Sequence, residues 1–331
     1  MVDGQDVVVL AGFGGPESMA DIEPFLRSIL AGRPIPAERM ANMVARYESV
    51  NGYSPFCAEV RSFAERLETL LVDTGVELPV WLTYLHRSPQ PEELAQSLSH
   101  TAIRRVYVQV LTPFGGYEAY DKYVERLVAA FRAVESNDFA PELRFLPVLC
   151  EDPVYVETMA QHIVKHMVAS ESVKSVESIH LNSRSGLLFT AHSVPIAMRG
   201  REQYEREMER TVAAIVERMA AQSMESPNAA PWWDHNRVRI AWQSRSGRPD
   251  QPWLGPSPVE VVRQERGSWF VVPIGFLFEN LELTYDLDQE VFAAISERPS
   301  DRYIRLPAVG SQSGMVRVVA KKILSEIMRG I

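Results

Sequence analysis

Four acidic side chains lie close together just after a strongly apolar run, in the stretch GFLFENLELTYDLDQE (275–290). On an α-helix that begins near Glu279, all four fall within one stripe, because successive residues are rotated by about 100° around the axis. Like charges at this spacing repel one another and cost stability. The stripe is therefore either a face exposed to water or a site that binds something positive. Its members are Glu279, Glu282, Asp286 and Glu290.

A histidine occupies a position from which it can join such a site. His192 follows the short apolar run GLLFTA (186–191), which is typical of a buried strand. A side chain at the carboxyl end of a parallel strand faces the ligand-binding edge of the sheet rather than the core. Imidazole exchanges protons near neutral pH and also binds metals. The alternative is a histidine that only stabilises the turn before Pro195 by hydrogen bonding.

The histidine and one of the carboxylates together favour a particular kind of metal. Imidazole nitrogen and carboxylate oxygen suit a borderline divalent cation such as Fe²⁺. His192 and Glu282 alone make a poor permanent cage, but they make a reasonable transfer point that holds a metal briefly. We expect the further carboxylates, Asp286 and Glu290, to form a path that attracts hydrated cations. The alternative for the whole stripe is a solvated acidic face.

Two other patterns give weaker signals. His162 and His166 are spaced i, i+4 and could clamp a metal on a helix. No third ligand of the H-E-x-x-H type accompanies them, so we expect a solvated helix face. The stretch AGFGGPE (11–17) does not complete the G-x-G-x-x-G fingerprint, because its last position is Glu17. We therefore expect no dinucleotide-binding site there.

Short apolar runs alternate with longer amphipathic stretches along the whole chain, which predicts an α/β fold with parallel, doubly wound sheets. Because the order repeats, we expect two similar Rossmann-like lobes, each with a four-stranded sheet, and a cleft between them. The predicted first lobe is 1–150 plus a C-terminal helix at about 313–331, and the second, with the metal site, is 151–312. The predicted strands are 7–12, 79–84, 105–111, 143–149, 186–191, 238–243, 269–275 and 303–308, and the main predicted helices are 57–71, 123–134, 155–168, 203–219 and 315–324.

Length and composition restrict the classes of function. A chain of 331 residues suits two domains. The formal net charge of −9, without any basic block, disfavours a nucleic-acid partner. The two cysteines, Cys57 and Cys150, provide neither a disulfide framework nor a multi-cysteine metal cluster, which fits a reducing compartment. No signal-peptide pattern and no apolar run of about 18 residues is found, so we expect a cytoplasmic protein without a transmembrane segment.

Five motifs occur in the sequence: AGFGGPES (11–18), LTPFGG (111–116), TAHSVP (190–195), WQSRSGRPDQPWLGPS (242–257) and VVPIGFLFENLELTYDLD (271–288). In this order they resemble the ferrochelatases, which insert Fe²⁺ into a porphyrin. The resemblance covers nearly the whole chain, and it implies a chelatase-like fold of two Rossmann-like lobes around a porphyrin cleft. It also implies Fe²⁺ as a substrate and no tightly bound cofactor. Some relatives hold a [2Fe–2S] cluster, which we do not expect here because no cysteine follows Cys150.

Within the family, GRPIPAERMANMVARYESVNGYSP (32–55) is most similar to the soluble bacterial enzymes that metallate coproporphyrin III. The resemblance implies that His192 and Glu282 are the catalytic and metal-binding pair. One of them accepts a pyrrole proton while the other positions the metal. Asp286 and Glu290 fall on the acidic residues of a metal entry path. The implied substrate-binding residues are Phe13, Arg46, Tyr47, Ser54 and Tyr123.

The implied partners are a porphyrin and Fe²⁺, with transient contacts to other haem-pathway enzymes, and the expected oligomeric state is a monomer. The alternatives are a ferrochelatase for protoporphyrin IX, another porphyrin metal chelatase, and a catalytically weak haem or porphyrin carrier. The chain departs from the soluble enzymes at Phe13, Leu30 and Phe114, where many of those enzymes have tyrosine, arginine and histidine. We expect four phenylalanines near the mouth of the cleft to cover the porphyrin faces, with core packing as the alternative: Phe13, Phe114, Phe276 and Phe278.

Overall fold

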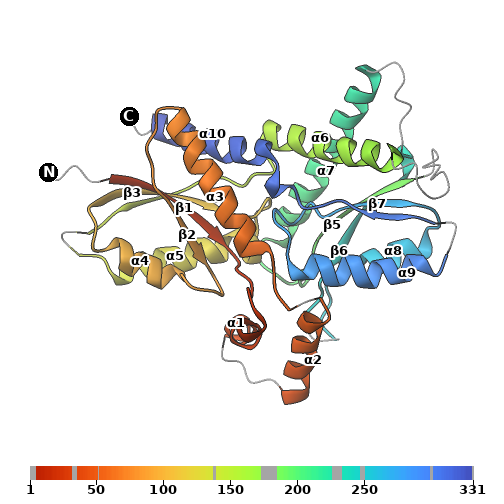
Figure 1. Cartoon of the computed structure of the whole chain (residues 1–331), viewed down its shortest axis with the longest axis horizontal. Helices are drawn as coiled ribbons and strands as arrows, with labels where there is room; N and C mark the ends of the chain where they lie inside the picture. The colour runs from red at the N-terminus through yellow and green to blue at the C-terminus, as the bar shows by residue number, and fades with distance from the viewer. Residues whose placement is uncertain are drawn as a thin grey trace. The chain divides into compact units, whose positions relative to one another are not determined.

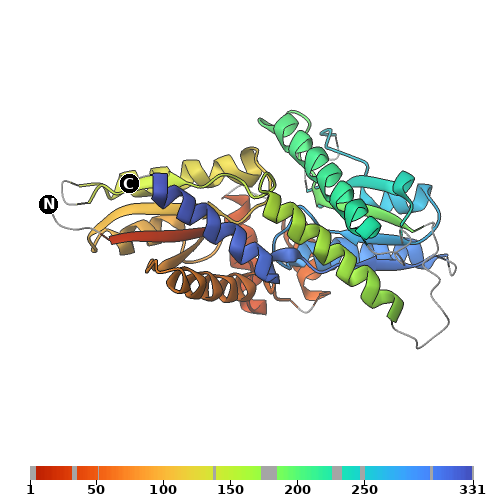
Figure 2. The same cartoon turned by 90° about the horizontal axis from the view of Figure 1, so that it is seen from above.

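The chain forms two compact units, each built on its own parallel sheet (Figure 1, Figure 2). Unit 1 comprises Met1–Leu149, Phe278–Leu281 and Met315–Ile331, and unit 2 comprises Cys150–Leu277 and Glu282–Gly314. The short segment Phe278–Leu281, which lies within the predicted second lobe, therefore belongs to unit 1. The structure, a computed structural model, describes residues 5–31, 36–50, 52–136, 139–172, 185–225, 233–246, 250–298 and 301–329.

The sheet of unit 1 has the strand order β2-β1-β3-β4, and all its neighbouring strands run parallel. One face of this sheet packs on α4 and α5, with Val7 and Val108 among the buried residues at the contact. Figure 1 shows α3 and α10 on the opposite face. The elements are β1 (Gln5–Gly12), β2 (Val80–Tyr84), β3 (Ile103–Val110), β4 (Glu142–Phe145), α1 (Ile22–Leu30), α2 (Ala37–Glu48), α3 (Phe56–Asp73), α4 (Pro91–Leu98), α5 (Lys122–Ala133) and α10 (Ser313–Arg329).

The sheet of unit 2 repeats this order as β6-β5-β7-β8, again with parallel neighbours. Leu188, Ala241 and Val271 lie on the face that packs against α8, α9 and η4. Figure 1 shows α6 and α7 on the other face. The elements are β5 (Gly186–His192), β6 (Val238–Gln243), β7 (Trp269–Val272), β8 (Tyr303–Arg305), α6 (Pro153–Ser172), α7 (Arg201–Glu225), α8 (Pro258–Gln264), η4 (Leu283–Val291) and α9 (Phe292–Ser296).

The predicted α/β fold with two four-stranded parallel sheets is confirmed. Three strands end three or four residues earlier than predicted, and a proline follows each of these ends. β4, β7 and β8 end at Phe145, Val272 and Arg305, shortly before Pro147, Pro273 and Pro307. Proline has no N–H to donate to a neighbouring strand, so it ends the regular pairing. None of the helices in the described part of the chain is long and apolar enough to cross a membrane.

The helix that carries the acidic residues differs from the predicted one. The prediction was an α-helix beginning near Glu279; in the structure only residues 281 and 282 are α-helical before η4, which continues from Leu283 to Val291 as a π-helix. Glu279 precedes this helix, and its backbone N–H donates to Oε2 of Glu59 at 3.0 Å within unit 1. Glu279 is therefore not part of the acidic stripe. The stripe is reduced to three carboxylates, at the start, middle and end of η4.

Candidate active site

His192 lies at the carboxyl end of β5, in the middle of the sheet of unit 2. It is paired in register with Gln243, the last residue of β6. In the order β6-β5-β7-β8, the connection after β5 leads to β6 and the connection after β7 leads to β8, in opposite directions, so the carboxyl ends of β5 and β7 flank a topological switch point. Ligands of open α/β sheets bind at such points. The strand order alone therefore places His192 where ligand chemistry is expected.

The segment after β7 approaches the end of β5 through a glycine. The N–H of Gly275 donates to the carbonyl of Thr190 at 3.0 Å. A Cβ atom at position 275 would lie 2.5 Å from Cβ of Ala191, closer than carbon atoms approach in proteins. Glycine is therefore required if this segment is to run against β5. Seven residues later the same segment delivers Glu282 to the side of His192.

The structure brings the two side chains of the predicted pair together. Nε2 of His192 lies 3.7 Å from Oε1 of Glu282, and the two side chains are 35% and 44% exposed. Nδ1 of His192 lies 2.5 Å from the carbonyl oxygen of Ser193, to which it donates. This hydrogen bond orients the ring and leaves Nε2 for Glu282 or a ligand. The pair is accessible, oriented and contained within unit 2.

The pKa of His192 reflects the neighbouring acids. Burial acts to lower it, but the charge of Glu282 and its hydrogen bond oppose burial, aided by the carbonyl of Ser193 and the charge of Asp286, so that the pKa is raised to about 9. An imidazole with this pKa is protonated at neutral pH. The site can therefore hold a proton next to a carboxylate that attracts cations.

Asp286 lies on η4, one helical turn beyond Glu282. Burial and the charge of Glu282 raise its pKa to about 6, and Glu290 adds to this effect. The hydroxyl of Ser244 donates to Oδ2 of Asp286 and acts in the opposite direction. Glu290 itself is exposed at the end of the π-helix. The three carboxylates thus form a series along the helix, from Glu282 beside His192, through Asp286, to the exposed Glu290.

Two residues of this neighbourhood were missed by the sequence reasoning. Ser244 has a positive φ of 62°, which is uncommon outside glycine, and so directs its hydroxyl at Asp286. Its place just after β6, at the ligand-binding end of the sheet, was a usable signal. Tyr204 on α7 donates its hydroxyl to the carbonyl of His192 at 3.1 Å, and its ring lies 5.3 Å from that of Trp242. No pattern in the sequence indicated that contact.

The described segments contain no group of three or more His, Cys, Asp or Glu side chains that could hold a metal ion. His192 and Glu282 are therefore two candidate metal ligands, and Asp286 lies one helical turn beyond Glu282. Two protein ligands leave most coordination positions of an Fe²⁺ ion for water or for a substrate. Such an arrangement suits a metal in transit.

Three of the predicted substrate-binding residues lie near one another in unit 1. Phe13 follows β1 and is 38% exposed. Its ring makes edge contacts with His86 and Phe25, at centroid distances of 4.7 and 6.0 Å. The ring of Tyr47 on α2 lies 6.3 Å from that of Phe25, and the neighbouring Arg46 is exposed. An aromatic surface with an adjacent guanidinium is available on this unit.

The other predicted substrate residues are buried. Ser54 is 5% exposed, and its backbone N–H donates to the carbonyl of Pro16 at 2.7 Å. Tyr123 is 7% exposed and belongs to the core between the sheet and α5. Phe114 and Phe278 are fully buried, so core packing describes them, whereas Phe276 is half-buried against the core of unit 2. Of the four phenylalanines expected to cover the porphyrin, Phe13 is the most accessible.

The pair His162 and His166 does not form the solvated helix face that was predicted. His162 is 2% exposed, and its Nε2 donates to the carbonyl of Pro307 at 2.7 Å. The two rings lie 4.3 Å apart on the inner side of α6. The i, i+4 spacing showed that both side chains share a face, but it did not show which face packs against the rest of unit 2.

The fold is that of the chelatases. SirB from Bacillus subtilis, solved with Fe³⁺ and described elsewhere as a sirohydrochlorin chelatase, matches with a TM-score of 0.56 and 12% identity, covering 97% of this chain and 94% of SirB. At this identity the similarity concerns the fold alone. The family profile described as Ferrochelatase matches residues 5–327. The chain belongs to the ferrochelatase family.

Relatives within this family are similar over almost their whole length. A protein of Mycobacteroides abscessus named coproporphyrin III ferrochelatase is 31% identical over 98% of this chain and 89% of its own. A protein of Propionibacterium freudenreichii with the same name is 29% identical over 97% of this chain and 87% of its own. The predicted family is confirmed, and with it an enzyme that inserts iron into a porphyrin.

Proposed function

We propose that this enzyme inserts Fe²⁺ into coproporphyrin III during haem biosynthesis. The observation that carries the proposal is the approach of His192 to Glu282, 3.7 Å apart at the switch point of unit 2. The choice of porphyrin is supported by the names of the relatives from M. abscessus and P. freudenreichii. Protoporphyrin IX is the alternative substrate.

Metal insertion requires two protons to leave the inner nitrogens of the free porphyrin. We propose that His192 and Glu282 share the two tasks of accepting protons and guiding the metal. The carboxylate of Glu282 attracts the cation. Because the negative charge of Glu282 raises the pKa of His192, a cation bound at Glu282 lowers that pKa and favours release of the imidazole proton. Binding energy from the rest of the porphyrin can bend the ring and expose its nitrogen lone pairs.

The porphyrin is proposed to be held by residues of unit 1. Phe13 offers an accessible ring for stacking, and Arg46 offers an exposed guanidinium, which pairs well with a propionate. Tyr47 lies beside Arg46 in the sequence and packs near Phe25. For Ser54 and Tyr123, the proposal rests on the resemblance, because both are buried.

The metal is proposed to arrive along η4, from Glu290 to Asp286 and then to Glu282. The exposed end of this series attracts hydrated cations, and the hydroxyl of Ser244 holds the middle carboxylate in place. Beyond the two substrates, we propose no tightly bound cofactor and no [2Fe–2S] cluster. We further propose a cytoplasmic monomer with two domains, whose bounds follow units 1 and 2.

The proposed function is tested by anaerobic Fe²⁺ insertion into coproporphyrin III and protoporphyrin IX, followed by absorbance. We expect a higher kcat/KM for coproporphyrin III. His192→Ala and Glu282→Ala are expected to reduce turnover by at least about a hundredfold while porphyrin binding persists. His100→Ala, at an exposed histidine of unit 1, is the control.

The possible outcomes of this experiment distinguish the proposed function from its alternatives. Faster turnover with protoporphyrin IX would replace the proposed substrate by the alternative one. Near-normal turnover of His192→Ala would refute its role. Tight porphyrin binding without insertion by the parent protein would indicate a carrier.

A further inference from the structure

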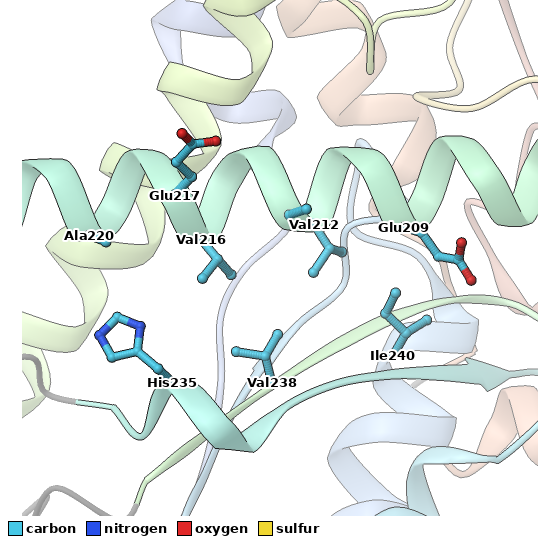
Figure 3. Close-up of a pocket in the computed structure, with 9 residues that line it drawn as sticks. Glu209, Val212, Val216, Glu217, Ala220, His235, Val238 and Ile240 are labelled. Carbon is cyan, nitrogen blue, oxygen red and sulfur yellow. The ribbon is translucent and has the colours of Figure 1, made fainter.

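A long groove lies between α7 and β6 in unit 2, on the sheet face opposite to η4 (Figure 3). Its volume is about 550 Å³. Val212 and Val216 of α7 point toward Val238 and Ile240 of β6 and form an apolar floor, as Figure 3 shows. Ala213 and Ala220 extend this floor, and Glu209, Glu217 and His235 also line the groove. None of these residues belongs to the candidate active site.

The groove borders an open sheet edge. β6 is an edge strand, with β5 as its only neighbour in the sheet described. The N–H of Trp242 donates to the carbonyl of Pro256 at 2.9 Å, away from β5. N–H groups two residues apart on a strand point to the same side, so those of Ile240 and Val238 also point away from β5. The contact with Pro256 thus covers the edge of β6 at Trp242. The part of the edge beside the groove is at Val238 and Ile240.

The charge at the groove rim is negative. On α7, Glu202 pairs with Arg206, and Glu205 pairs with Arg201. Glu209 and Glu217, in contrast, are exposed and make no ion pair with any residue that the structure describes. Eight residues of α-helix separate them, which corresponds to about 12 Å. The two positions are therefore about 12 Å apart along α7; Figure 3 shows the side chain of Glu209 extending toward β6 and the carboxylate of Glu217 on the side of α7 away from β6.

We propose that this α7–β6 groove binds an extended segment of a partner protein, which adds as a strand to the free edge of β6. The segment has the pattern cation-x-apolar-x-cation, where the cations are Lys or Arg. Alternate side chains of an added strand point to the same face, here toward α7. Four residues of strand span about 13 Å, close to the rise of about 12 Å between positions 209 and 217 of α7. The apolar residue then fills the floor between Val216 and Ile240.

The charge also argues against two other occupants. An anionic membrane surface would be repelled by Glu209 and Glu217. In a two-fold dimer through this groove, the same acidic rim of both copies would meet, which brings like charges together. A basic partner segment relieves this charge, and the open strand edge supplies the hydrogen bonds.

The test uses the full-length protein and the peptide acetyl-TKTVTKT-amide, followed by NMR of the valine and isoleucine methyl groups. We expect the methyl signals of Val216, Val238 and Ile240 to shift on titration. Replacing both lysines of the peptide by glutamate is expected to abolish these shifts. The double variant Glu209→Gln/Glu217→Gln is expected to weaken binding about threefold or more, since each exposed ion pair contributes modestly. Glu297→Gln, which removes an exposed charge at the end of α9, is expected to leave the affinity unchanged.

A second pair of variants tests the strand edge and the floor. Ile240→Pro removes the outward N–H, and Val216→Lys places a charge in the floor; each is expected to abolish peptide binding while iron insertion continues at the parental rate. Unchanged binding in both variants would overturn the proposal. Tighter binding of a helical peptide with the same charges would also overturn it, as would shifts caused by self-association or by anionic vesicles rather than by the peptide.

Discussion

The protonation of His192 depends mainly on one neighbouring carboxylate. The charge and hydrogen bond of Glu282 oppose the effect of burial and raise the pKa of the imidazole to about 9. Glu282→Gln keeps the shape of the side chain but removes the charge. We expect the pKa of His192 to fall to or below the ordinary value of about 6.5, because burial then dominates. NMR titration of the imidazole in the variant measures this change directly.

Glu290→Gln is the matched control for this titration. It removes a carboxylate from the same helix, but Glu290 is exposed and is not among the main causes of the shift in the pKa of His192. We therefore expect the titration to stay near that of the parent. Equal effects of the two substitutions would show that the overall negative charge of η4, rather than the contact with Glu282, sets the protonation of His192.

At the scale of elements, a single glycine sets how closely the segment after β7 approaches β5. A methyl group at position 275 would overlap Ala191, next to His192. We expect Gly275→Ala to destabilise the protein by about 1–3 kcal/mol, as overpacking does, and to lower turnover by displacing Glu282 from His192. Urea unfolding and the insertion assay measure the two effects. Gly255→Ala adds the same methyl where no atom lies within 4 Å, and a similar loss in that control would contradict the argument.

The π-helix η4 arranges three carboxylates along one route. π-Helical turns are rare and are found frequently at functional sites. If Asp286 and Glu290 concentrate cations near Glu282, their neutralisation weakens metal capture more than it slows the chemical step. We expect Asp286→Asn/Glu290→Gln to raise the KM for Fe²⁺ about tenfold, with kcat changed less than about twofold.

This prediction is checked by steady-state kinetics at low and high ionic strength. At high salt, the KM values of the parent enzyme and the double variant for Fe²⁺ are expected to become similar, because salt screens exposed charges. Glu297→Gln, with a similar exposed carboxylate at the end of α9, serves as the control. A fall in kcat with an unchanged KM would show that these residues act in the chemical step instead.

The sequence predicted some of these elements well and others poorly, for physical reasons. Buried parallel strands leave continuous apolar runs, so every strand was found, and the proline positions explain the early ends of β4, β7 and β8. The position of His192 followed from the strand before it. A π-helix has no distinct periodicity in a short acidic segment, so η4 was predicted as an α-helix beginning too early. The contact of Glu279 with Glu59 joins distant parts of the chain and left no local signal.

At the scale of the whole molecule, the same strand order occurs twice, but the two units place different side chains at the end of the first strand of the sheet, with His192 in unit 2. In unit 1 the corresponding position after β1 is held by Phe13, an apolar and accessible ring. The duplicated topology therefore supports two different chemistries. The burial of Tyr123 and Phe114 could not be predicted, because neighbouring positions on an amphipathic helix or strand end differ in exposure only through tertiary packing.

Each unit also buries one histidine, and this gives the molecule an acid-sensitive stability. Burial is the main cause that lowers the pKa of His86 in unit 1 and of His162 in unit 2, each to about 4. Between pH 6.5 and about 4, the unfolded chain binds protons at these positions and the folded chain does not. The free energy of unfolding therefore falls as the pH decreases through this window. The fall approaches about 3 kcal/mol for each histidine.

His162→Gln tests this effect in unit 2, because glutamine can still donate to the carbonyl of Pro307 but does not titrate. The measured quantity is the loss of unfolding free energy in urea between about pH 7.5 and about pH 5, where the parent is expected to lose roughly 2 kcal/mol through His162. We expect the variant to keep this roughly 2 kcal/mol on acidification, whatever its stability at the higher pH. His100→Gln replaces an exposed histidine and is expected to keep the parental pH dependence. If His162→Gln loses as much stability as the parent on acidification, protonation of His162 is not a cause of the acid sensitivity.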